Sequence, residues 1–363
     1  MATQAEAAGI LQEFRRHLEL SVRQHAGPVA IVLAFAAVGW FVGDRYGLSA
    51  LRAIWLYIPT YVYVVPVAIA LILAARGAQI ILVDRPKRPL SMLAREVRDR
   101  YATGERIAFA LPVLVFMPVF AGTLTLFKSL LWRINPFAWD EVFADWDAAL
   151  HFGYAPWELL QPVLGYPVVT WSVNWVYNLW FFVLALVWIW QAFSLRDRHL
   201  RLQFFYALLL TWILLGCIAA IVFSSAGPCY YGRVVDGSDP FAPLMAYLHD
   251  VDRQRSVWAL AAQERLWQFL NADELRLGGG ISAMPSMHVA MAFLFFLVGR
   301  RASPILGALL FGYFLLILIG SVHLAWHYAI DGYFAVLAVL PIWFLSGRLA
   351  ARTYPATRNR APA

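Results

Sequence analysis

The chain contains eight runs of mostly apolar residues, each close to the length that a helix needs to cross a bilayer. A helix rises about 1.5 Å per residue, so about 20 apolar residues cross the hydrocarbon core. The runs lie at 28–44, 53–75, 107–127, 172–193, 204–223, 284–299, 304–325 and 328–347. This pattern predicts an all-α integral membrane protein with about eight transmembrane helices.

The composition excludes several classes of protein. Hydrophobic residues make up 61% of the chain and charged residues 14%, whereas a soluble domain carries about 25% charged residues. A soluble enzyme and a disordered chain are therefore excluded, and Cys217 and Cys229 alone cannot build a disulfide framework. The net charge of +7 is spread between the apolar runs rather than gathered in one patch, so we expect no nucleic-acid partner.

The basic residues indicate how the chain is oriented. Most of the 29 Lys and Arg residues fall in alternate segments, namely those before 28, at 76–106, at 196–201, at 300–301 and after 347. The positive-inside rule then places both termini in the cytoplasm. The alanine-rich, arginine-rich composition favours a bacterium, so we expect the inner membrane, with the outer segments in the periplasm.

The last two runs form one apolar stretch over 304–347. As a helix it would be about 66 Å long, twice the thickness of a bilayer core, so it must fold back on itself. The only polar place for the turn is 321–331, SVHLAWHYAID. Two outer segments, 128–171 and 224–283, are also long, and segments of this length are more often functional than merely connecting.

The expected turn contains a histidine and a carboxylate on one helix face. His327 and Asp331 are four residues apart, so the carboxylate can hold the Nδ1 proton and leave Nε2 free to attack. The alternative is a pair that only satisfies two polar groups at a helix end. We expect His323, four residues earlier, to be packed or interfacial.

A second cluster precedes the sixth run. Pro285 suits the first turn of a helix, which would place Ser286, Met287 and His288 where unpaired backbone N–H groups bind anions. Ser286 adds a hydroxyl donor, and His288 adds an acid or base. The alternative is a glycine linker followed by an ordinary helix start. By the expected topology, His288, His327 and Asp331 all lie at the outer membrane face.

These residues resemble a known family. Pro-Ser-Met-His at 285–288 and His-Tyr-Ala-Ile-Asp at 327–331 resemble two motifs of the phosphatidic acid phosphatase type 2 superfamily. The second is in the form typical of the inositol phosphorylceramide synthase-like, aureobasidin-resistance type, branch. The resemblance covers about 107–347 and implies a six-helix catalytic core made of spans 3–8. It leaves 1–106 as a two-helix N-terminal addition with a basic cytoplasmic amphipathic segment, 128–171 and 224–283 as outer caps, and 348–363 as a cytoplasmic tail.

The resemblance also implies a mechanism. His327, oriented by Asp331, would attack a lipid-linked phosphate while His288 protonates the leaving oxygen, and a phosphohistidine would form. A lipid alcohol would then accept the group, as in transfer of an inositol-phosphate-like headgroup to a sphingolipid; hydrolysis by water is the alternative. The donor would be a phospholipid or another lipid phosphate. No cofactor and no metal are implied, and the oligomeric state stays open.

The sequence departs from the family pattern at two cations. The superfamily's first motif, a Lys followed seven residues later by Arg-Pro, is absent, and Ser321 stands where the last motif has an Arg. We expect Arg233, beside Tyr231, to replace the lost cation, with Lys128 as second choice. With Ser286 and Met287 these residues form the expected phosphate-binding set. For Lys128, the alternative is that its side chain merely reaches to the interface.

Two other functions compete with this interpretation. His323, His327 and Asp331 recur every four residues, which suits a metal-dependent membrane oxidase but supplies few ligands. The missing cations also fit a catalytically inactive lipid-binding or transport protein, although transporters usually gather polar residues at the bilayer midplane.

Overall fold

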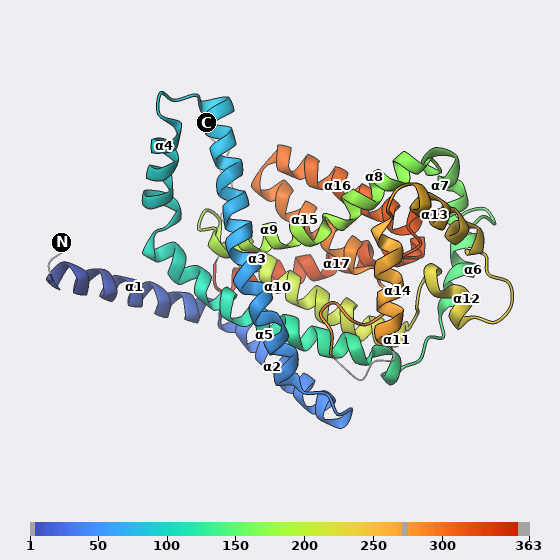
Figure 1. Cartoon of the computed structure of the whole chain (residues 1–363). Helices are drawn as coiled ribbons and strands as arrows, with labels where there is room; N and C mark the ends of the chain where they lie inside the picture. Colours follow the sequence, from blue (N-terminus) through green and yellow to red (C-terminus); the bar gives the residue numbers. More distant parts are fainter. Residues whose placement is uncertain (1–3, 271–274, 355–363) are drawn as a thin grey trace.

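The computed structural model describes residues 4–270 and 275–354, and every regular element within them is a helix (Figure 1). Seven helical segments are long and apolar enough to cross a membrane. They are α2 (Ala26–Arg45), α3 with its continuation (Ala50–Asp84), α5 (Gly104–Ile134), α8 and α9 (Pro167–Phe193), α10 with its continuation (Arg198–Val222), α16 (Pro304–His323) and α17 (Ala329–Ala351). The protein is therefore an all-α integral membrane protein.

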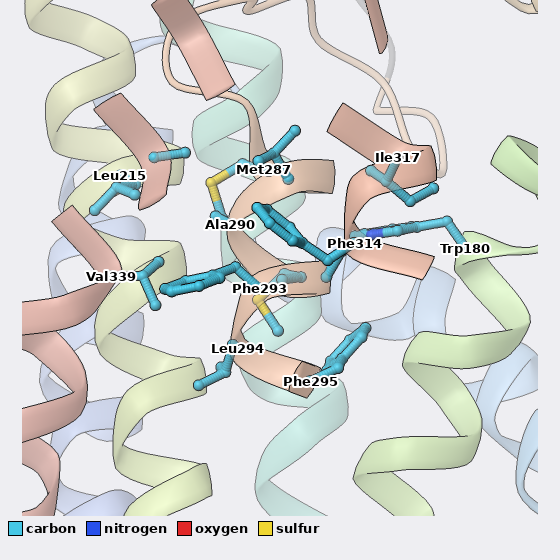
Figure 2. Packing of buried hydrophobic residues seen from close by; sticks show 14 of the residues in the cluster. Trp180, Leu215, Met287, Ala290, Phe293, Leu294, Phe295, Phe314, Ile317 and Val339 are labelled. Atoms are coloured by element: carbon cyan, nitrogen blue, oxygen red, sulfur yellow. The ribbon is translucent and has the colours of Figure 1, made fainter. Parts of the chain in front are cut away.

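The run expected at 284–299 forms the shorter helix α15 (Met287–Ala302), which has 16 residues. Figure 2 shows Phe293 and Leu294 of α15 among side chains of the surrounding helices, including Leu215, Phe314 and Val339. Most of its residues are buried. Because protein rather than lipid encloses α15, it does not have to match the thickness of the hydrocarbon core.

The remaining α-helices lie outside these spans, as do a short π-helix, Val97–Tyr101, and a 3-10 helix, Pro228–Tyr230. The α-helices are α1 (Gln4–Gln24), α4 (Pro89–Glu96), α6 (Asp140–Leu150), α7 (Pro156–Leu164), α12 (Tyr231–Val234), α13 (Ala242–Gln254) and α14 (Trp258–Leu270). Helix α1 was not predicted. Helices α6, α7, α12 and α13, from the two long segments expected to form caps, gather at one end of the molecule, and α4 lies at the opposite end (Figure 1). Of the expected tail at 348–363, residues 355–363 lie outside the described residues.

Hydrogen bonds attach the segment 224–283 to the bundle beneath it. The amide of Ala259 in α14 donates to the Asn174 side chain of α8 at 3.1 Å. The Gln263 side chain donates to the carbonyl of Leu324 at 2.9 Å, and the amide of Cys229 donates to the carbonyl of Ala325 at 2.9 Å. The second and third bonds reach the turn between α16 and α17, so this segment covers the turn that carries His327.

Candidate active site

The turn between α16 and α17 places His327 directly before the start of α17. The carbonyl of Ser321 accepts from the amides of Trp326 and His327 at 2.9 and 3.1 Å. Ala325 has φ 58, so the chain reverses through the left-handed region. This reversal confirms that the stretch 304–347 folds back within 321–331.

The described contacts of His327 fix one side of its ring. Nδ1 lies 3.2 Å from Oδ2 of Asp331 and 2.8 Å from the carbonyl oxygen of Ala283. Both partners are acceptors, so Nδ1 carries the proton and Nε2 has the free electron pair. Within the described residues, Nε2 takes part in no hydrogen bond. The site therefore presents an unprotonated ring nitrogen that could act as a nucleophile.

The carboxyl group of Asp331 is fully buried. Its Oδ2 also accepts from the amide of Tyr328 at 3.0 Å, which fixes the carboxylate at the first turn of α17.

Burial lowers the pKa of His327 to about 3. The hydrogen bond to the Ala283 carbonyl opposes this effect, and the charge of Lys128 lowers the pKa further. His327 is therefore neutral at physiological pH.

His288 approaches His327 from the first turn of α15. The two ring centroids are 6.2 Å apart and the rings are tilted by 58°, close enough for both to contact one phosphate-sized group. Tyr177 stacks on His288 with centroids 4.9 Å apart, and the Trp180 ring lies at 4.3 Å. The Trp180 indole N–H donates to the His288 carbonyl at 3.1 Å. Aromatic contacts from α8 and α9 thus hold the second histidine.

Ser286 and Met287 complete the start of α15. Ser286 is fully buried and is the N-cap, because its Oγ accepts from the amide of Val289 at 3.4 Å. The Ser286 amide donates to the carbonyl of Asp331 at 3.2 Å, which joins α15 to α17. The amides of Met287 and His288 donate no hydrogen bond to any of the described residues. These two N–H groups lie at the positive end of a helix dipole.

Comparison with known proteins agrees with this geometry. Residues 141–345 match the family model described as the PAP2 superfamily, where PAP2 is the phosphatidic acid phosphatase type 2 group. The chain belongs to the PAP2 superfamily. No curated protein and no solved structure matches it significantly. Membership supports an activity of the lipid phosphatase or phosphotransferase type.

The two cations considered as replacements for the missing PAP2 motif residues lie in different surroundings. Arg233 forms an ion pair with Glu264 at 2.8 Å and stacks over the ring of Trp267. The hydrogen bond from Arg233 holds the pKa of Glu264 below its usual range. Within the part of the chain that the structure describes, no hydrogen bond or ion pair joins Arg233 to His288 or His327. Its expected place in the phosphate site therefore stays a prediction.

Lys128, near the end of α5, lies within electrostatic reach of both His288 and His327. The backbone explains part of this placement. Gly280 has φ 92, and a Cβ there would come within 2.1 Å of the Lys128 carbonyl oxygen. Gly280 thus packs tightly against α5 a few residues before α15 begins. Tyr231 is buried, and its ring lies 5.4 Å from that of Phe241.

His323 points into a different set of contacts in this PAP2 protein. Its Nε2 lies 2.9 Å from the hydroxyl of Thr170, and that hydroxyl lies 2.7 Å from the hydroxyl of Tyr247. Within residues 4–270 and 275–354, no group of three or more His, Cys, Asp or Glu residues could hold a metal ion. His323, His327 and Asp331 are therefore not grouped closely enough in the described structure to serve together as metal ligands.

Sequence reasoning missed the role of two carboxylates in α6. Its alternation of acidic and aromatic residues is typical of an amphipathic helix in a membrane interface, but the pattern does not show that Asp140 and Asp147 are each only 2% exposed. Asp147 accepts from the amides of Ala329 and Ile330, in the first turn of α17. The one available signal was their spacing of seven residues, which puts both on one helix face.

Proposed function

We propose that this PAP2 superfamily protein transfers a phosphate or a phosphate-linked headgroup between lipids through a phosphohistidine on His327. The observation that carries the proposal is the pairing of His327 with Asp331 and Ala283 through Nδ1, with the His288 ring 6.2 Å away. This arrangement supplies a nucleophile, the group that orients it, and a second imidazole for proton transfer.

The reaction has two balanced steps. In the first, Nε2 of His327 attacks phosphorus, the N–P bond forms, the bond from phosphorus to the leaving oxygen breaks, and His288 gives that oxygen a proton. In the second, His288 takes the proton of an acceptor hydroxyl whose oxygen attacks phosphorus. The N–P bond then breaks, and its electron pair returns to His327.

Positive charge and N–H groups would stabilise the phosphoryl oxygens during both steps. Lys128 lies near enough for its charge to lower the pKa of His327, and the amides of Met287 and His288 are available at the start of α15. Pre-organised donors of this kind are usually the largest contribution to stabilising a phosphoryl transition state. We therefore assign Lys128 rather than Arg233 as the phosphate-binding cation.

The covering segment favours a lipid alcohol over water as acceptor. Gln263 and Cys229 bond to the turn that carries His327, and His327 is only 6% exposed. Restricted access to bulk water protects a phosphohistidine from hydrolysis. Hydrolysis of a lipid phosphate is the second candidate because it uses the same groups. The inositol-phosphate-type headgroup and the sphingolipid acceptor rest on the resemblance of the sequence, chiefly in the motif at 327–331, to one branch of the family.

The test uses the full chain in proteoliposomes that contain a lipid donor labelled at phosphorus. The reaction is quenched in base, since phosphohistidine is labile in acid, and labelled protein and labelled lipid products are measured. The wild type is expected to give both, and the H288A/H327A double variant neither. H249A, at an exposed histidine of α13, is the matched control and should behave like the wild type. Full turnover in the double variant would overturn the proposal.

A further inference from the structure

Helix α6 lies outside the spans but contacts the site from the side. Its two buried carboxylates, Asp140 and Asp147, are seven residues apart and face the bundle. Asp145, between them, is exposed, as are the apolar side chains of Trp146 and Leu150. The helix thus buries two of its four carboxylates, while Glu141 and Asp145 stay exposed. Buried carboxylates require strong hydrogen-bond partners.

The first set of partners is the start of α17. The two carboxylate oxygens of Asp147 accept from the amides of Ala329 and Ile330 at 2.7 and 2.9 Å. These amides are among the donors that a helix start leaves unpaired, and a carboxylate there also interacts favourably with the helix dipole. Asp147, a residue of α6, therefore caps α17. The capped end of α17 begins at Ala329, two residues after His327.

The second set of partners surrounds the same turn. Asp140 accepts from the amides of Ala226 and Gly227, both at 2.8 Å, and from the hydroxyl of Tyr328, also at 2.8 Å. Tyr328 immediately follows His327, and its amide donates to Asp331. Its hydroxyl bond to Asp140 therefore fixes the residue that links the nucleophile to its carboxylate.

We propose that Asp140 and Asp147 are positioning residues that hold the His327 turn and α17 in register, so that Nε2 of His327 aims at the phosphorus. The inference rests on the proposed function and adds two residues to it. A carboxylate that accepts several buried N–H and O–H bonds leaves those donors unpaired when it is removed. Displacement of a nucleophile by about 1 Å can lower its rate by about 100-fold.

A purely stabilising role makes a different prediction. If α6 only contributes to folding, its variants should lower the thermal midpoint without changing the turnover of the molecules that stay folded. If it positions the turn, kcat should fall while KM, which reports substrate binding, changes little. The amides of Ala329 and Ile330 should also lose protection against hydrogen exchange once their acceptor is weakened.

The experiment compares D147N and Y328F with the control D145N, all as full-length chains in the same detergent or proteoliposomes. D147N keeps the size of the side chain but only one acceptor oxygen, Y328F removes a single hydroxyl, and D145N changes an exposed carboxylate on the same helix. We measure kcat and KM for lipid transfer, the rate of phosphohistidine formation, the thermal midpoint, and hydrogen exchange in a peptide covering 324–335.

The expected results separate the variants clearly. For D147N we expect kcat to fall roughly 30-fold with KM within about threefold, and exchange at Ala329 and Ile330 to rise at least about tenfold. For Y328F we expect a roughly tenfold fall in kcat, and for D145N no change beyond about twofold. A D147N protein with wild-type kcat overturns the inference, even if its thermal midpoint falls. A wild type inactive in every lipid assay overturns the proposed function and the inference together, whereas inactivity of H327A with normal D147N turnover overturns only the inference.

Discussion

The two halves of the site are built from different interactions. The half around His327 consists of hydrogen bonds, with Asp331 and Ala283 on the ring and with Asp147 at the start of α17. In the half around His288, the imidazole ring is held by ring contacts with Tyr177, Trp180 and Phe181, and the one described hydrogen bond to this residue reaches its backbone carbonyl. The ring nitrogens of His288 form no hydrogen bond with any of the described residues.

This difference fits the two chemical tasks that we propose for the histidines. A nucleophile must keep one tautomer and one direction of attack, and only directional hydrogen bonds to Nδ1 provide both. A group that gives a proton and later takes one back must keep its ring nitrogens available. Aromatic neighbours restrict the position of the His288 ring without occupying either nitrogen. The comparison can be tested by changing each half separately.

The largest expected effect separates the two histidines by the leaving group of the donor. H327A should lose at least about 10⁴-fold in turnover with every donor, because no N–P bond can form. H288A should lose roughly 10³-fold with a lipid alkoxide leaving group but recover most activity with a nitrophenyl phosphate donor, whose leaving group needs no proton. Initial rates for both donors give the answer, and equal losses for both variants and both donors would contradict the division of roles.

An intermediate effect concerns the cation shared by the two halves. K128M should lower kcat/KM roughly 100-fold because it removes the positive charge that acts on both imidazoles. R233M, which breaks an ion pair between two partly exposed side chains, should change kcat/KM less than about threefold. Steady-state kinetics with one lipid donor compare the two variants. The reverse order of effects would restore Arg233 as the phosphate ligand.

The smallest expected effect is on stability. Burial raises the pKa of Asp147 to about 6 from its usual 3.8, although the amides of Ala329 and Ile330 favour the ionised form. Because the folded-state pKa lies above the unfolded one, this group's contribution to stability is complete below about pH 4 and is lost as the pH rises through about 6.

The corresponding measurement is the thermal midpoint of the wild type relative to D147N between about pH 4 and pH 7. The advantage of the wild type should shrink by about 2 kcal/mol, or about 3 °C, over this range. D145N serves as control and should follow the wild type. Parallel curves for the wild type and D147N would show that the proton on Asp147 is not linked to folding.

Much of the fold could be predicted because it depends on local composition. Apolar runs of sufficient length predict the spans, and the length of the 304–347 stretch predicts a reversal at its only polar segment. Hydropathy could not show that α15 is central. A helix buried in protein and a helix that faces lipid are both apolar, so their hydropathy values are similar. Helix α1 was missed because its sequence lacks a continuous apolar run.

The candidate site likewise contains some residues that could be paired from the sequence and others that could not. The spacing of four residues was enough to pair His327 with Asp331, although His327 lies just before α17 rather than on its face. The surroundings of Arg233 depend on Glu264, 31 residues away, and the burial of Asp140 depends on amides 86 and 87 residues away. Such partners are chosen by tertiary packing, and a single sequence carries no signal for them.

The surroundings of Gly227 show that segments distant in the sequence must pack together before the site can form. A Cβ on this residue would lie 2.9 Å from the carbonyl oxygen of Trp326 and 3.1 Å from the Cβ of Ala283, and its φ is 104. Ribosomes make the chain from the N-terminus, so the loop at 227 and both carboxylates of α6 emerge well before their partners at 326–330. The hairpin of α16 and α17 therefore completes the candidate site, and a nascent chain that ends before residue 327 contains His288 and the start of α15 but lacks both His327 and Asp331.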